Sequence, residues 1–183
     1  MAQRSTVYKA NINIADMDRG YYADHLITLA LHPSETQERM MVRLLAFILN
    51  ASEHLSFARG LSSEDDGPEL YEQALNGDID LWVAFGQPDE KWLRKASNRA
   101  RKVLLYTYGG RSVGVWWPQH ESALQRYTNL AVWEIGEAQV TEMLGLVDRS
   151  MVLQASISEG QLWLSNAEKS VHIVPVSLKE AKE

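Results

Sequence analysis

Two-residue alternation of polar and apolar positions opens and closes the chain. Residues 6–14 alternate in their second half, and after a turn-like run at 16–20 a second strand-like run covers 21–31. We predict that these two runs form a hairpin. Three further alternating runs stand near the other end, and they predict a β-meander of strands at 151–157, 161–164 and 170–174.

A helical period of apolar residues follows the predicted hairpin, in HPSETQERMMVRLLAFILN. Ser34 begins a capping box, and the carboxylates of Glu35 and Glu38 would lie near the positive end of the helix dipole. Arg39 and Arg43 are expected to stack on the solvent side of this helix. Glu38 is in line with the apolar positions, so we expect its carboxylate at the edge of the core.

Apolar runs and helical patterns alternate through the middle of the chain. Residues 79–85 read as a central strand, and a helix is predicted from Pro88 to about Arg101. Gly109 and Gly110 indicate a hairpin turn. The other elements predicted here are one long loop at 60–77, strands at 103–108 and 112–117, a short helix at 118–127, a strand at 130–135 and a helix at 137–147.

This alternation predicts the α/β (α+β) class, with a mixed sheet flanked by helices and extended by antiparallel strands. The length of 183 residues and the hydrophobic content of 45% predict one domain over residues 1–183. Because cysteine is absent, disulfides, thiolate zinc sites and cysteine nucleophiles are excluded. We expect a cytoplasmic location and no membrane partner, since neither a secretory pattern nor an apolar span is present.

The net charge of −6 is unevenly distributed along the chain. Between positions 91 and 102 there are six basic residues and no acidic one: Lys91, Arg94, Lys95, Arg99, Arg101 and Lys102. On a helix, four of these cations would share one face, and Arg94 and Arg101 would share another. Such a face is either a solvated surface or a place to hold a phosphate backbone, and the residues alone leave both interpretations open.

One acid stands inside the predicted central strand. Alternation places Asp80 on the same face as Trp82 and Ala84. A buried carboxylate costs several kcal/mol unless it is paired, protonated or bound to a cation. Asp80 is therefore either a structural partner of an arginine or a helix cap, or a ligand of a hard cation with Glu38 as the second carboxylate.

Four segments of the chain resemble the YaeQ family of bacterial proteins, whose biochemical role is unsettled. They are LHPSETQERMMVRLLAF, DIDLWVAFGQPDEKWLRKA, YTYGGRSVGVWW and RSMVLQASISEGQLWLS, so the resemblance extends over essentially the whole chain. It implies a variant of the restriction-endonuclease-like PD-(D/E)XK fold, with an α-β-β-β-α-β core and extra strands. It also implies a site in which carboxylates hold Mg²⁺ or Mn²⁺ at a scissile phosphate.

Carried onto this sequence, the resemblance makes Glu38 the helix acid and Asp80 the strand acid of that site, and both metal ligands. Lys91 or Lys95 would take the place of the motif lysine. The family pattern has Glu where this chain has Ala84. The implied catalytic site is therefore partly eroded.

Three hypotheses for function remain open. In the first, the protein is a Mg²⁺- or Mn²⁺-dependent phosphodiesterase acting on nucleic acid, with Lys91 or Lys95 on the phosphate and Gln87 orienting the attacking water. In the second, the scaffold is a noncatalytic module that binds nucleic acid or protein. In the third, it is a partner of a transcription or repair protein. The nucleic-acid-binding residues would be Arg94, Arg99, Arg101, Lys102 and Arg111, and the oligomeric state is left open.

Overall fold

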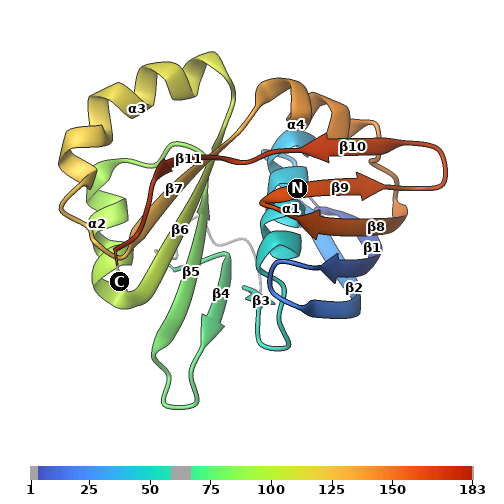
Figure 1. Cartoon of the computed structure of the whole chain (residues 1–183), viewed down its shortest axis with the longest axis horizontal. Coiled ribbons are helices and arrows are strands. Elements are labelled where there is room, and N and C mark those ends of the chain that lie inside the picture. Colours follow the sequence, from blue (N-terminus) through green and yellow to red (C-terminus); the bar gives the residue numbers. More distant parts are fainter. Residues whose placement is uncertain (1–3, 59–66, 183) are drawn as a thin grey trace. The chain divides into compact units, whose positions relative to one another are not determined.

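The computed structural model describes residues 4–58 and 67–182, and within them it has the predicted α/β class (Figure 1). These residues form two mixed sheets and four helices. The chain divides into two compact units. Unit 1 comprises residues 1–49 and 136–175, and unit 2 comprises residues 50–135 and 176–183. None of the helices in the described ranges is long and apolar enough to cross a membrane.

Unit 1 is built on a five-stranded sheet in the order β10-β9-β8-β1-β2. Its strands are β1 (Thr6–Asp16), β2 (Tyr21–Leu31), β8 (Ser150–Ser158), β9 (Gln161–Ser165) and β10 (Ser170–Ile173). The predicted hairpin and meander are both confirmed, as the antiparallel pairs β1–β2, β8–β9 and β9–β10. Alternation did not predict that β1 and β8 pair in parallel, which joins the two distant parts of the chain into one sheet.

Unit 1 also contains α4 (Glu137–Leu144) and α1 (Gln37–Asn50), the latter as far as Leu49. The first helix begins later than its capping box predicted. Thr36 Oγ1 accepts a hydrogen bond from the Arg39 N–H at 3.1 Å, as an N-cap does. Ser34 Oγ instead forms a 2.6 Å hydrogen bond with His32 Nδ1, so its side chain is not available to cap the helix.

Arg43 corrects the expectation that this part of α1 faces solvent, because its residue is only 6% exposed. Arg43 Nε and Nη2 donate to the two carboxylate oxygens of Glu35 at 2.9 and 3.0 Å. Nη2 also donates to Ala30 O at 3.1 Å, while Arg39 donates to Glu35 at 3.1 Å. Since a bidentate carboxylate satisfies the guanidinium, its charge can be buried, and it ties α1 to β2.

Unit 2 has a six-stranded sheet in the order β11-β7-β6-β5-β4-β3. Its strands are β3 (Ser56–Phe57), β4 (Leu70–Gln73), β5 (Ile79–Phe85), β6 (Ala100–Tyr108), β7 (Leu130–Ile135) and β11 (Val176–Lys179). The three strands β5, β6 and β7 are parallel neighbours, connected by α2 (Glu90–Arg99) and α3 (Arg111–Leu124). The predicted loop at 60–77 is wrong where β4 forms, and its part at 60–66 lies outside the described residues.

The segment that follows β6 was also predicted wrongly. Instead of a strand and a short helix, residues 111–124 form the single helix α3, with Pro118 inside it. Gly109 and Gly110 have φ values of 111° and 58°, so they make the turn from strand to helix rather than a hairpin. The physical reason is topological, because adjacent parallel strands need a crossover connection, for which a helix is the usual form.

An apolar cluster fills the space on the helix-covered side of β5, β6 and β7. Its largest members include Trp82, Leu93, Leu105 and Trp116. The C-terminal strand β11 is attached to this unit by Lys179, which is 6% exposed and donates from Nζ to Tyr127 O at 2.8 Å and Leu130 O at 2.7 Å. Burial lowers the pKa of the Lys179 ammonium, and nearby Lys182 lowers it further.

The Glu35–Arg43 pair gives a first prediction about stability. Both side chains are buried, with 5% and 7% exposure. The substitution Glu35→Gln leaves the Arg43 charge without its counterion, so we expect a loss of about 3 kcal/mol in the free energy of unfolding, measured by urea denaturation. The matched control is Glu38→Gln in the first turn of α1, which is half-exposed and is expected to change the free energy of unfolding by less than about 1 kcal/mol. Equal effects of the two substitutions would contradict the buried pair.

Candidate nucleic-acid interface

The basic run predicted from the sequence lies on α2 and the start of β6. After β5 the chain turns at Gly86, and Asp89 caps α2 by accepting the Trp92 N–H at 2.8 Å. The helix ends at Arg99, because Ala100 already has extended backbone angles and begins β6. Arg101 and Lys102 are therefore strand residues, and the prediction that they continue the helix faces is wrong.

All six basic side chains of this run are exposed. On α2 the buried residues are Leu93 and Ala96, so the four cations of the helix occupy its outer side. In β6, Val103 and Leu105 belong to the apolar cluster, and alternation places Arg101 on their side of the sheet and Lys102 on the other. We define the basic α2 surface as Lys91, Arg94, Lys95, Arg99 and Arg101.

One member of this surface, Arg99, contacts an aromatic ring. The guanidinium carbon of Arg99 lies 5.2 Å from the centre of the Trp82 ring, within the range of a cation–π interaction. Trp82 in turn meets Trp92 edge to face, with ring centres 5.5 Å apart. Trp82 is 1% exposed, so its ring is fixed by packing. Arg99 is exposed at the end of α2, but its guanidinium contacts this fixed ring.

The two acids at the start of α2 have hydrogen-bond partners. Asp89 is the helix cap, and Glu90 accepts a short hydrogen bond from the Tyr127 hydroxyl. Burial raises the pKa of Tyr127, and the hydrogen bond and the charge of Glu90 raise it further, so the hydroxyl keeps its proton and remains a donor. Among the described residues, no hydrogen bond or ion pair is made by the side chains of Lys91 and Arg101.

Asp80 is less buried than its apolar neighbours in the sequence suggested. It lies at the amino end of β5, where the first three residues are half-exposed and the buried positions begin only at Trp82. In the β5–β6 register, Asp80 falls between the pairs Ile79–Ala100 and Leu81–Lys102, so it stands beside Arg101. The carboxylate is therefore only partly desolvated, because the end of a strand is more accessible than its middle.

The structure does not bring Gln87 to Asp80. Gln87 follows the carboxyl end of β5, seven residues away, which corresponds to about 20 Å along a strand. Gln87 Nε2 donates to Tyr108 O and lies 3.5 Å from Ser112 Oγ, so it connects the turns that precede α2 and α3. Arg111 is exposed at the first position of α3, beside the same turns.

Position 84, where the resemblance in the sequence implies a carboxylate, belongs to the core of unit 2. Ala84 is 4% exposed and lies in the apolar cluster with Leu105 and Trp116. Glu38 lies in the first turn of α1, in unit 1, and Asp80 lies in unit 2. No group of three or more metal-ligating side chains occurs within residues 4–58 and 67–182. The metal pair Glu38–Asp80 stays a prediction.

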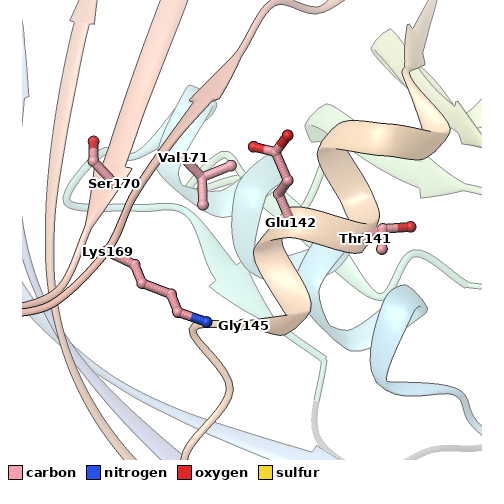
Figure 2. A pocket seen from close by; sticks show the side chains of 6 residues that line it. All are labelled: Thr141, Glu142, Gly145, Lys169, Ser170 and Val171. Atoms are coloured by element: carbon pink, nitrogen blue, oxygen red, sulfur yellow. The ribbon is translucent and has the colours of Figure 1, made fainter.

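Unit 1 contains a pocket of about 370 Å³ that the sequence did not indicate (Figure 2). Thr141, Glu142 and Gly145 line it from α4 and the turn after it, and residues 169–171 line it from the start of β10. Figure 2 shows the ammonium of Lys169 beside Gly145, and a Cβ built on this glycine would lie 2.9 Å from Nζ. None of the site residues predicted from the sequence lines this pocket.

Comparison with known proteins places these features in a family. The model of the family described as YaeQ protein matches residues 1–175. The Uncharacterized protein YaeQ of Salmonella typhi is 46% identical over 173 residues, which cover 94% of this chain and 95% of that protein. The protein of the same name from Escherichia coli (strain K12) is 43% identical over the same length and the same shares of both chains.

Two crystal structures resemble the whole chain. The YaeQ protein from Xanthomonas axonopodis pv. citri has a TM-score of 0.92 and 45% identity, and covers 97% of this chain and 99% of its own. The YaeQ protein from Pseudomonas syringae has a TM-score of 0.91 and 34% identity, with 98% of both chains covered. The similarity in sequence and in structure thus extends over nearly the full length.

The packing of Ala84 gives a second prediction. We expect Ala84→Glu to lower the free energy of unfolding by about 2–4 kcal/mol, because it inserts a carboxyl group among apolar side chains. Thermal and urea denaturation followed by circular dichroism measure the loss. The control is Asn98→Glu, which adds the same group at an exposed position of α2 and is expected to cost less than about 0.5 kcal/mol. A stability of Ala84→Glu equal to that of the control would show that position 84 admits a carboxylate.

Proposed function

The chain belongs to the YaeQ family, and we propose that it binds nucleic acid without cleaving it, through the basic α2 surface. The observation that carries the proposal is the placement of five exposed cations on one helix and the adjoining strand of a chain with net charge −6. Lysine and arginine side chains that displace counterions from phosphates supply most of the affinity in sequence-independent binding.

Three features favour a phosphate backbone over a merely solvated surface. Acids are absent from positions 91 to 102, so no negative charge on this segment opposes an approaching polyanion. Asp89 and Glu90, the acids at the start of α2, are held by the Trp92 N–H and the Tyr127 hydroxyl. The contact of Arg99 with Trp82 reduces the entropy that this side chain would lose on binding.

The noncatalytic part of the proposal rests on position 84. A carboxylate at this position is part of the implied nuclease site, and here an alanine packs in the apolar cluster. Gln87 is separated from Asp80 by the length of β5 and is bonded to Tyr108 O. We therefore derive no step through a Mg²⁺ or Mn²⁺ ion.

The relation to the nuclease-like fold is part of the same proposal. Along the chain, the elements α1, β3, β4, β5, α2 and β6 follow one another in the order α-β-β-β-α-β. In unit 2, β3, β4 and β5 are antiparallel neighbours, and β6 pairs with β5 in parallel after the crossover through α2. This order and pairing support a scaffold of the nuclease type that has kept its binding surface.

The test is a binding titration of fluorescently labelled single- and double-stranded DNA and RNA at several salt concentrations. We expect the affinity to fall steeply with salt, and the triple substitution Lys91→Glu, Arg94→Glu and Arg101→Glu to weaken binding by at least about tenfold. This variant should also reduce the slope of log K against log salt by about 1 for each phosphate contact that is lost.

The matched control is Arg4→Glu, Lys9→Glu and Lys169→Glu, which changes the net charge equally at three exposed cations of unit 1. An equal loss in both triple variants would attribute the binding to total charge and contradict the proposed surface. Incubation of the same substrates with Mg²⁺ or Mn²⁺ tests the noncatalytic part. Cleavage that disappears in Asp80→Asn would overturn it and support the phosphodiesterase hypothesis.

A further inference from the structure

The strand β2 is the one long outer strand of the sheets in the described residues. The other terminal strands are short, with two residues in β3 and four each in β10 and β11. In contrast, β2 has eleven residues and pairs with β1 without a bulge from Thr6–Leu31 to Asp16–Tyr21. Short, bulged or charged outer strands are the usual protection against pairing with another chain, and β2 has a different design.

The backbone groups on the outer side of β2 can be identified from two hydrogen bonds. The Lys9 N–H donates to Arg149 O at 2.9 Å, so the odd-numbered residues of β1 bond toward β8 and the even-numbered ones toward β2. In the β1–β2 register, even-numbered residues face odd-numbered ones, for example Ala10 and Ile27. The even-numbered residues of β2 therefore direct their N–H and C=O groups away from the sheet.

The contact of Arg43 with Ala30 O agrees with this assignment, and it occupies one end of the outer side. The remaining groups belong to Tyr22, Asp24, Leu26 and Thr28. No hydrogen bond from elsewhere in the described part of the chain reaches the backbone of these four residues. They present an alternating row of donors and acceptors, which a further strand would complete.

The side chains of β2 do little to prevent such pairing. The strand contains no Lys, Arg, Pro or Gly, and its one carboxylate, Asp24, accepts a 2.7 Å hydrogen bond from Asn13 of β1. Leu26 is 76% exposed and Tyr22 is 64% exposed on the outward face. A long, regular and partly apolar outer strand of this kind is a template for strand addition.

We propose that β2 pairs with β2 of a second copy of this chain, antiparallel across a two-fold axis, to form a continuous ten-stranded sheet. The outward N–H and C=O groups of β2 favour a second copy of the chain as the partner. An antiparallel copy of β2 presents the same donors and acceptors in complementary order. The pairing adds main-chain hydrogen bonds and covers the exposed Leu26 side chain.

Charge and burial select one register. Pairing Asp24 with Asp24 of the second copy would oppose like charges, and pairing Asp24 with Leu26 would place a carboxylate against an apolar side chain. A shift by one further pair brings Leu26 opposite Leu26 of the second copy and Asp24 opposite Thr28. This register buries the most exposed apolar residue of the strand. It also brings Tyr22 opposite Ala30, whose C=O already accepts a hydrogen bond from Arg43, so we expect the added main-chain hydrogen bonds at Asp24, Leu26 and Thr28.

The first test measures the mass of the full chain by light scattering after size-exclusion chromatography over a concentration series. We expect a species of twice the 20.7 kDa chain mass at tens of micromolar, an order of affinity typical of small interfaces. Leu26→Lys places like charges opposite each other and is expected to weaken the dimer by about tenfold or more.

The matched control is Val152→Lys. Val152 is 71% exposed and lies in the same row of the sheet, since Asn11 pairs with both Leu26 and Val152, but it belongs to the inner strand β8. The control should remain dimeric. A monomeric native chain at up to about 100 µM, or equal dissociation by both substitutions, would overturn the proposal.

A cross-linking measurement tests the register without depending on the lysine variant. Because the chain has no cysteine, Leu26→Cys introduces a single thiol. Opposed residues in a hydrogen-bonded antiparallel pair have Cα atoms about 5.5 Å apart, which a disulfide can bridge. We expect rapid covalent dimerisation under mild oxidation for Leu26→Cys and little for Val152→Cys. Equal rates for the two variants would contradict the pairing of β2.

Discussion

The structure depends most on one constraint, which concerns the outer strands of each sheet. The N–H and C=O groups that these strands direct away from the sheet need a hydrogen-bond partner. An unpaired N–H or C=O group is acceptable only where water or a side chain can reach it. Near the end of β10 this is arranged by Gln139, which accepts the Val174 N–H at 3.1 Å. Beside β7, the Lys179 ammonium on β11 binds the carbonyls of Tyr127 and Leu130. On the outer side of β2, Arg43 donates to Ala30 O, and no hydrogen bond from elsewhere in the described residues reaches the backbone of Tyr22, Asp24, Leu26 and Thr28.

Acidic and basic side chains have different roles in this structure. Several acids have structural partners: Glu35 neutralises Arg43, Asp89 caps α2 and Glu90 receives the Tyr127 hydroxyl. The cations of α2 instead extend from the side opposite Leu93 and Ala96. A net negative chain can thus present a positive surface, because positions 91 to 102 contain no acid and because Asp89 and Glu90 at the start of α2 are engaged by an N–H and a hydroxyl group.

Local patterns in the sequence predicted what depends on local physics. Alternation identified β1 and β2 and the terminal meander, and the 3.6-residue period identified α1. The failures have tertiary causes. Residues 112–117 resemble a strand, but they form part of α3 because β6 and β7 are parallel and need a crossover. Arg43 resembles a surface residue, but Glu35 allows it to be buried. Of the site, the cations of α2 were predicted, whereas the exposure of Asp80 and the packing of Ala84 depend on where β5 begins and on the cluster beside it.

The two proposed surfaces, the basic α2 surface and the outer side of β2, belong to different units. Pairing through β2 would affect nucleic-acid binding by joining two chains. A pair of chains joined through β2 contains two copies of the basic α2 surface. Two weak phosphate-binding surfaces in one assembly raise the affinity for a long polyanion when both can engage it, because the second contact is intramolecular. Binding by the single chain needs only α2, so a β2 variant that stays monomeric keeps its intrinsic affinity for a short oligonucleotide. Dependence on polymer length therefore separates the contribution of the pairing from that of the binding surface itself.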